Sequence, residues 1–90
     1  MTTTLDLTIV NRLGLHARAA AKFVHVASAF TSRVTVARDA TRVDGKSILG
    51  LLTLAASKGT KLRLTIQGDD ESQAGAQLSE LVRGRFGEDA

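Results

Sequence analysis

Two stretches in which apolar and polar residues strictly alternate constrain the fold of this chain more than any other feature. In LDLTI (residues 5–9) and LRLTI (residues 62–66), leucine or isoleucine occupies every second position. Alternate side chains of an extended strand point to opposite faces, so each stretch has one apolar and one polar face. Strands covered on one face are typical of antiparallel or mixed sheets, because strands covered on both faces are apolar throughout.

Two further strands and three helices complete the expected architecture. VTVAR (34–38) alternates more weakly, and TRVD (41–44) follows an Asp39-Ala40 turn as the return arm of a hairpin. Apolar residues recur at helical spacing in residues 17–30, 48–56 and 70–86. The predicted order is β-α-β-β-α-β-α, an α/β (α+β) open-faced β-sandwich in which three helices cover one face of a four-stranded antiparallel or mixed sheet.

The length of the chain, 90 residues, predicts a single domain spanning residues 1–90. Cysteine is absent, which excludes disulfides, thiolate metal ligands and a cysteine nucleophile. The N-terminal MTTTLDLTIV does not look like a secretory signal, and no apolar run approaches the roughly 18 residues of a membrane span. We therefore expect a soluble cytoplasmic protein without membrane insertion.

The charge distribution suggests an anionic partner. Residues 1–63 hold ten of the twelve Lys and Arg residues but three of the nine Asp and Glu residues, so the remaining residues are acidic. A basic body fits phosphate, nucleic acid or an acidic protein surface. The basic residues are scattered, however, and three phenylalanines are the only aromatic residues on which bases could stack. We expect no nucleic acid partner.

ATRVDGKS (residues 40–47) nearly matches the P-loop pattern G-x-x-x-x-G-K-[ST], with alanine in the first position. A nucleotide site is one interpretation, but TRVD has no glycine and is predicted to be a strand, whereas a phosphate cradle needs a loop of inward-facing amides. The favoured interpretation is a hairpin followed by a helix with Ser47 as its N-cap. The leucines and isoleucine of ILGLLTL (48–54) cannot all face the core of so short a helix, which predicts an exposed apolar docking surface.

GLHARAAAKF (residues 14–23) places His16 at or just before a helix N-terminus, because glycine favours a turn and the alanines favour a helix. The first-turn amides have no acceptor within the helix and form an anion site there. A neutral imidazole beside that site could accept a phosphoryl group, and Arg18 could contact its oxygens. An alternative is that His16 only caps the helix. His25 is expected to be solvated, and no further histidine or carboxylate pair indicates a metal site.

Three segments together resemble HPr, the histidine-containing phosphocarrier family of the bacterial phosphotransferase system. They are NRLGLHAR with its alanine-rich helix, FTSRVTVARD, and GKSILGLLTLAASKGTKLRLTIQGDDE. The resemblance covers nearly the whole chain, and the element order of the family agrees with the order predicted above.

The resemblance implies that Nδ1 of His16 takes a phosphoryl group from enzyme I, supplied by phosphoenolpyruvate, and passes it to a IIA domain of a sugar permease. It implies that Arg18 stabilises this group, and that Ser47 is phosphorylated by an HPr kinase/phosphorylase. The protein would be a monomeric carrier and not itself an enzyme, and it would need no cofactor. The docking surface implied for the partners comprises Ala17, Arg18, Ala21, Ile48, Leu49 and Leu52.

One position departs from the family motif H-A-R-P-A, because Ala19 stands where the family has proline. Proline fixes φ and has no amide hydrogen, so Ala19 loosens the first turn and adds one potential amide donor near the phosphoryl site. We expect phosphotransfer to be retained with an altered rate or partner preference. A nitrogen-branch carrier (NPr) and a binding-only regulatory paralogue are the alternatives.

Overall fold

A computed structural model describes all residues, 1–90, and contains a four-stranded sheet. Its strands are β1 (Thr2–Thr8), β2 (Arg33–Arg38), β3 (Thr41–Asp44) and β4 (Lys61–Gln67). They lie in the order β1-β4-β2-β3, and every neighbouring pair is antiparallel. The predicted sheet is therefore confirmed as purely antiparallel, and residue 5 of the first alternating stretch pairs with residue 64 of the second.

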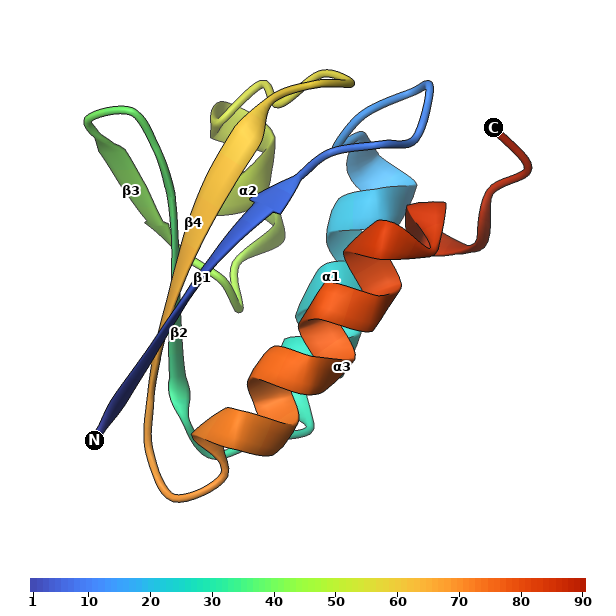
Figure 1. The fold of residues 1–90 in the computed structure, drawn as a ribbon. Helices are drawn as coiled ribbons and strands as arrows, with labels where there is room; N and C mark the ends of the chain where they lie inside the picture. The colour runs from blue at the N-terminus through green and yellow to red at the C-terminus, as the bar shows by residue number, and fades with distance from the viewer.

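Three α-helices cover one face of this sheet and leave the other face open (Figure 1). They are α1 (Ala17–Ser28), α2 (Ile48–Thr53) and α3 (Glu71–Arg83), and a short 3₁₀ turn, η1 (Arg85–Gly87), follows the last. In Figure 1, α1 and α3 lie side by side, and the C-terminal tail returns to the end of the molecule that holds the start of α1. The predicted open-faced β-sandwich is confirmed.

The core lies between the sheet and the helices and consists of 19 buried apolar residues. Strand β4 contributes its three alternating residues, Leu62, Leu64 and Ile66, while of the intervening positions 63 is exposed and 65 is partly exposed. Phe23 of α1 and Phe86 of η1 are the largest buried side chains, each 1% exposed. Burying side chains of this size removes the most apolar surface from water, so the two aromatic residues contribute strongly to holding α1 and η1 against the core.

Two helices end earlier than the apolar pattern predicted. The helix expected over 48–56 ends at Thr53, because Ala55 adopts a positive φ of 50° that no helix continues. Arg38 donates hydrogen bonds to the carbonyls of Leu54 and Ala55, which satisfies two acceptors at this helix end. The helix expected over 70–86 ends at Arg83, and Phe86 reaches the core from η1 with a positive φ of 53°.

The third predicted helix, over 17–30, is also shorter than expected, because α1 ends at Ser28.

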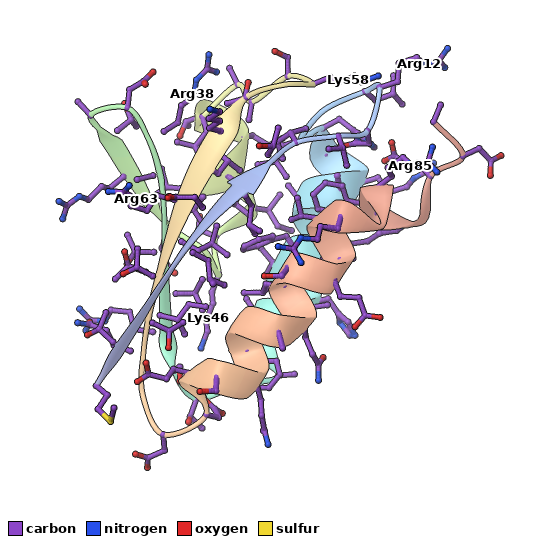
Figure 2. The ribbon with its side chains drawn as sticks, viewed as in Figure 1. Arg12, Arg38, Lys46, Lys58, Arg63 and Arg85 are labelled. Atoms are coloured by element: carbon purple, nitrogen blue, oxygen red, sulfur yellow. The ribbon has the colours of Figure 1, made fainter.

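Basic side chains project from many separate elements and form no single stripe (Figure 2). On the open face of the sheet, Arg63 pairs with Asp6 at 2.9 Å. No helix of the structure is both long enough and apolar enough to cross a membrane.

Candidate phosphohistidine site

His16 occupies the N-cap position of α1, at the end of the loop that follows β1. Gly14 turns this loop with a φ of +69°, a conformation that residues with a side chain rarely adopt. A Cβ atom at Gly14 would lie 2.5 Å from the carbonyl oxygen of Ala56, so the loop backbone packs directly against the segment after α2. The adjacent amide of Leu15 donates to the same carbonyl at 2.8 Å, which fixes the position of His16.

The imidazole of His16 does not cap the helix. Its side chain accepts no hydrogen bond from the first-turn amides, and the first helical hydrogen bond runs from the amide of Ala20 to the carbonyl of His16. The three amides before Ala20 therefore have no acceptor within the helix. The capping interpretation of His16 is wrong for the side chain, and the first-turn amides are left without an acceptor, as the prediction of an anion site requires.

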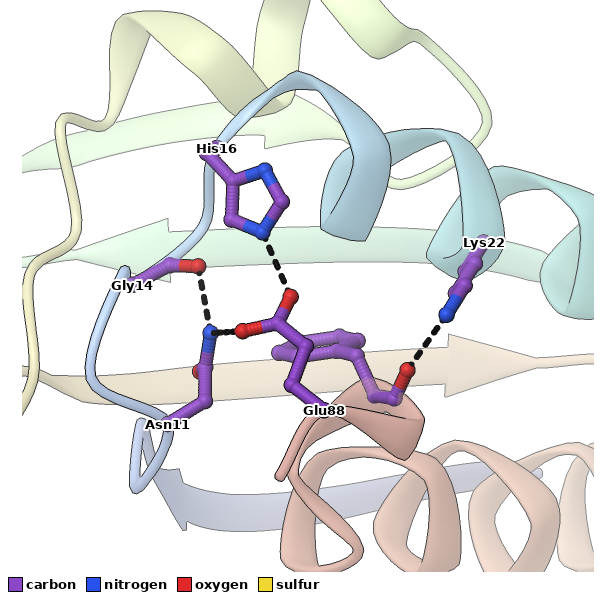
Figure 3. Close-up of polar contacts among 6 residues, drawn as sticks. Asn11, Gly14, His16, Lys22 and Glu88 are labelled. Atoms are coloured by element: carbon purple, nitrogen blue, oxygen red, sulfur yellow. Dashed lines mark hydrogen bonds and ion pairs between the residues drawn. The ribbon is translucent and has the colours of Figure 1, made fainter. Parts of the chain in front are cut away.

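One ring nitrogen of His16 contacts the C-terminal tail. Nε2 lies 2.5 Å from Oε2 of Glu88, and the other oxygen of the same carboxylate accepts a hydrogen bond from Nδ2 of Asn11 at 2.9 Å (Figure 3). Asn11 is fully buried and also donates to the carbonyl of Gly14 at 2.8 Å. The hydrogen bonds from His16 and Asn11 lower the pKa of Glu88 below its ordinary value, and the charges of His16 and Lys22 act in the same direction.

Backbone contacts on either side of Glu88 hold the tail against the start of α1. The amide of Arg12 donates to a main-chain oxygen of Ala90 at 3.0 Å, and Nζ of Lys22 donates to the carbonyl of Phe86 at 2.7 Å (Figure 3). Sequence analysis did not find Glu88, because it lies 72 residues from His16 and belongs to no recognisable motif. The acidic character of the tail opposite a basic body was the only available signal.

Nδ1 of His16 makes no hydrogen bond to the protein, and it lies on the side of the ring away from Glu88 (Figure 3). The side chain of His16 is 29% exposed, so this nitrogen is accessible from solvent. A neutral imidazole with one nitrogen protonated and the other free is a nucleophile near neutral pH. The geometry therefore combines a free nucleophilic nitrogen with the unpaired amides of a helix N-terminus.

The other predicted residues of α1 lie on the exposed side of the helix, within its first five residues. Arg18 lies in the first turn, is exposed, and takes part in none of the ion pairs of the structure. Its guanidinium is free to contact an arriving anion. Ala17 and Ala21 are also exposed, and α1 packs against α2.

Ser47 is the N-cap of α2, as the sequence predicted, and its Oγ accepts a hydrogen bond from the amide of Gly50 at 3.0 Å. The apolar residues of α2 divide as expected. Ile48 and Leu49 are exposed by 41% and 77%, Leu52 is half-buried, and Leu51 belongs to the core. Sequence analysis missed Leu13, which is 62% exposed in the loop before His16 and extends the set of exposed apolar residues.

The nucleotide-binding interpretation of ATRVDGKS is wrong. Residues 41–44 form strand β3, whose backbone pairs with β2, so these amides do not form a phosphate cradle. The amide of Gly45 donates to the carbonyl of Val34, and Nζ of Lys46 donates to the carbonyl of Phe30 at 2.8 Å. Both groups that a P-loop would direct at phosphate are therefore engaged within the protein.

His25 is exposed on α1. No group of three or more histidine, cysteine, aspartate or glutamate residues is arranged to hold a metal ion.

Comparisons with known proteins support the resemblance over nearly the whole chain. The family model described as "PTS HPr component phosphorylation site" matches residues 3–84. The chain is 51% identical over 83 residues to the phosphocarrier protein HPr of Neisseria meningitidis. The aligned residues cover 92% of this chain and 93% of the relative. It is 52% identical over 85 residues to the phosphocarrier protein HPr of Pseudomonas aeruginosa, with 93% and 94% covered.

A solved structure agrees with the sequence relatives. The crystal structure of HPr-C-His from Thermoanaerobacter tengcongensis has a TM-score of 0.94 and 41% identity, and the match covers 98% of this chain and 99% of that one. The resemblance seen in the sequence is confirmed by the family model, by curated relatives that are about 50% identical, and by this fold. The chain therefore belongs to the HPr family, the phosphocarrier proteins of the phosphotransferase system.

Proposed function

We propose that this protein accepts a phosphoryl group from enzyme I on Nδ1 of His16 and donates it to IIA domains of sugar permeases. The observation that carries the proposal is that the two ring nitrogens of His16 differ in their contacts. Nε2 is engaged by Glu88, whereas Nδ1 is unpartnered and exposed at a helix N-terminus. In this role the protein is a carrier and a substrate of other enzymes.

In the accepting step, the lone pair of Nδ1 forms a bond to phosphorus. The bond between phosphorus and the donor atom of enzyme I breaks, and its electron pair stays with the donor. The free amides of the first helical turn and the guanidinium of Arg18 face the added negative charge. Transfer to a IIA domain reverses these events, because the electron pair of the P–N bond returns to Nδ1.

Incubation with phosphoenolpyruvate and enzyme I tests this proposal. Intact-mass measurement should show one acid-labile phosphate on the wild-type protein and none on His16→Ala. His25→Ala is the matched control, since it removes the other histidine from the same helix and should leave the label unchanged. Absence of label on the wild type contradicts the proposal and favours a binding-only paralogue, while label supplied only by a nitrogen-branch enzyme I favours an NPr-type carrier.

We further propose that Ser47 is the regulatory phosphorylation site and that the docking surface comprises Ala17, Arg18, Ala21, Ile48, Leu49 and Leu52. A phosphate on Ser47 would add roughly two negative charges directly before the apolar residues of α2, and this added charge would repel an acidic partner. Ser47→Asp should therefore slow phosphorylation of His16 by enzyme I. Acid-stable label from ATP and an HPr kinase/phosphorylase, lost in Ser47→Ala, tests the modification itself.

We expect the protein to act as a monomer. Light scattering at the concentration of the phosphorylation assay should give a mass near 9.5 kDa, and twice that mass would contradict this expectation.

A further inference from the structure

The contact between Glu88 and His16 is more than a link between the tail and α1. We propose that Glu88 is a positioning residue of the carrier site, which keeps the proton of His16 on Nε2 and thereby keeps Nδ1 available for phosphoryl transfer in both directions. The proposal rests on the proposed function for its effect on transfer. Its effect on the imidazole of the free protein does not depend on that function.

The chemistry of the contact fixes which nitrogen carries the proton. The pKa of Glu88 is lowered by its hydrogen bonds to His16 and Asn11, so this carboxylate is ionised near neutral pH and is only an acceptor. Nε2 must then be the donor across the 2.5 Å contact. A neutral imidazole has a single N–H, so protonation of Nε2 leaves the lone pair on Nδ1.

Asn11 determines the orientation of the carboxylate. Its Nδ2 donates to both Glu88 and the carbonyl of Gly14, and its Oδ1 is buried without a partner. Reversing the amide would place that oxygen against two acceptors and lose both hydrogen bonds, so Asn11 has one favourable orientation. The side chain of Glu88 is 16% exposed and has limited freedom to turn away.

The same contact has a consequence for the phosphorylated ring. When Nδ1 bonds to phosphorus while Nε2 keeps its proton, the ring becomes cationic, and the Glu88 carboxylate faces that charge. When the P–N bond breaks, its electron pair returns to Nδ1 and the ring leaves neutral with Nε2–H intact, so no proton has to be supplied. Without Glu88, the phosphorylated ring would lose its Nε2 proton at lower pH and become a poorer donor.

Other charges near the ring do not substitute for this carboxylate. Lys22 acts on Glu88 and favours its ionised form. The charged residues on the elements around the ring are Arg18 and Lys22 of α1, Arg12 of the preceding loop, Lys58 of the segment after α2, and Arg85 and Asp89 of the tail. Asp89 contacts Arg85 through its backbone carbonyl, and its exposed side chain makes no hydrogen bond. Glu88 is therefore the one carboxylate on the ring.

Nitrogen-15 NMR of the unphosphorylated protein tests the proposal directly, in the alkaline range where the ring nitrogen shifts no longer change with pH and the ring is neutral. The wild type should show a protonated Nε2, an unprotonated Nδ1 and a slowly exchanging Nε2–H. Glu88→Ala should raise the exchange rate of that proton at least about tenfold, the loss expected for one charge-assisted hydrogen bond. Asp89→Ala, which removes a neighbouring carboxylate without touching the ring, should exchange like the wild type.

The pH profile of phosphoryl transfer to a IIA domain is the second readout. The alkaline fall in rate should move down by about one pH unit in Glu88→Ala, because one unit corresponds to a tenfold change in proton affinity. Glu88→Gln keeps the length of the side chain without its charge and guards against a general release of the tail, which the amide signals of Arg12 and Ala90 would report. Unchanged Nε2–H exchange in Glu88→Ala, or an equal change in Asp89→Ala, would overturn the proposal, even if His16 is phosphorylated normally.

Discussion

The hydroxyl of Ser47 stabilises helix α2, and replacing it separates the structural role of this residue from its proposed regulatory role. Its Oγ is the only side-chain acceptor at the start of α2, 3.0 Å from the amide of Gly50. Helix α2 has six residues, so a lost cap affects a large share of its backbone hydrogen bonds. Ser47→Ala leaves that amide without a protein partner, whereas Ser47→Asp retains a side-chain oxygen at the same position.

The expected magnitude follows from the cap and the size of the protein. Loss of a serine N-cap costs about 1 kcal/mol of the free energy of unfolding. For 90 residues the unfolding entropy is roughly 190 cal/mol/K, so the midpoint Tm of Ser47→Ala should fall by about 5 °C. Ser47→Asp should stay within about 2 °C of the wild type, because it keeps the cap and adds negative charge where the helix dipole favours it.

Thermal and urea denaturation followed by circular dichroism measure both effects. Ser72→Ala is the matched control, since Ser72 is exposed in the first turn of α3 and makes no hydrogen bond. A Tm of Ser47→Ala equal to that of the control would refute the reasoning that the cap stabilises α2. A Tm of Ser47→Asp as low as that of Ser47→Ala would show that any slower phosphorylation of this variant by enzyme I includes a folding defect.

Three further substitutions probe the loop before His16, the start of α1 and the start of α3. Gly14→Ala should lower the free energy of unfolding by about 2 kcal/mol or more and slow labelling of His16. The alanine would have a positive φ, and its Cβ would lie 2.5 Å from the backbone carbonyl oxygen of Ala56. Urea denaturation and the enzyme I assay measure the two effects. Ala19→Pro should leave the Tm close to that of the wild type and reduce the labelling rate of His16 by less than about tenfold, because it removes one amide that no helical hydrogen bond uses; complete loss of labelling would contradict this account. Asp70 accepts hydrogen bonds from the side chain of Ser32 and the amide of Thr31, and these lower its pKa to about 2. The ionised carboxylate of Asp70 therefore stabilises the folded protein fully above the pKa that Asp70 has in the unfolded chain, and this contribution is lost as pH falls toward about 2. Asp70→Asn should therefore have a lower Tm at neutral pH and a shallower fall in Tm between about pH 4 and pH 2, and parallel pH curves would contradict the assignment.

The sequence predicted the elements whose pattern is local. Alternation in residues 5–9 and 62–66 identified two strands, and the structure pairs them directly. The same kind of argument failed at helix ends, because Ala55 and Phe86 continue the apolar pattern while their backbones have positive φ. Apolar periodicity reports which side chains are buried, and burial in a turn satisfies it as well as burial in a helix.

The candidate site divides in the same way. His16 and Arg18 were found from the composition of a helix start, and Ser47 from the hydroxyl before a helix, since both signals depend on neighbours within one turn of the chain. The sequence indicated only that α2 carries more apolar residues than the core can take. Which of them face solvent was decided by the packing of α2 against α1 and β3.

By itself, the sequence determined a sheet covered on one face, antiparallel or mixed, the order of its elements and the presence of a histidine at a helix N-terminus, because these features depend on periods of two and 3.6 residues and on local turn chemistry. Only the tertiary structure decided that Glu88 meets Nε2 of His16, that Asn11 orients this carboxylate and that Nδ1 remains free. Residues 72 positions apart meet only when the core around Phe86 has packed and η1 has turned the tail back over α1. Which ring nitrogen of His16 remains without a partner is therefore a property of the folded chain and not of the motif.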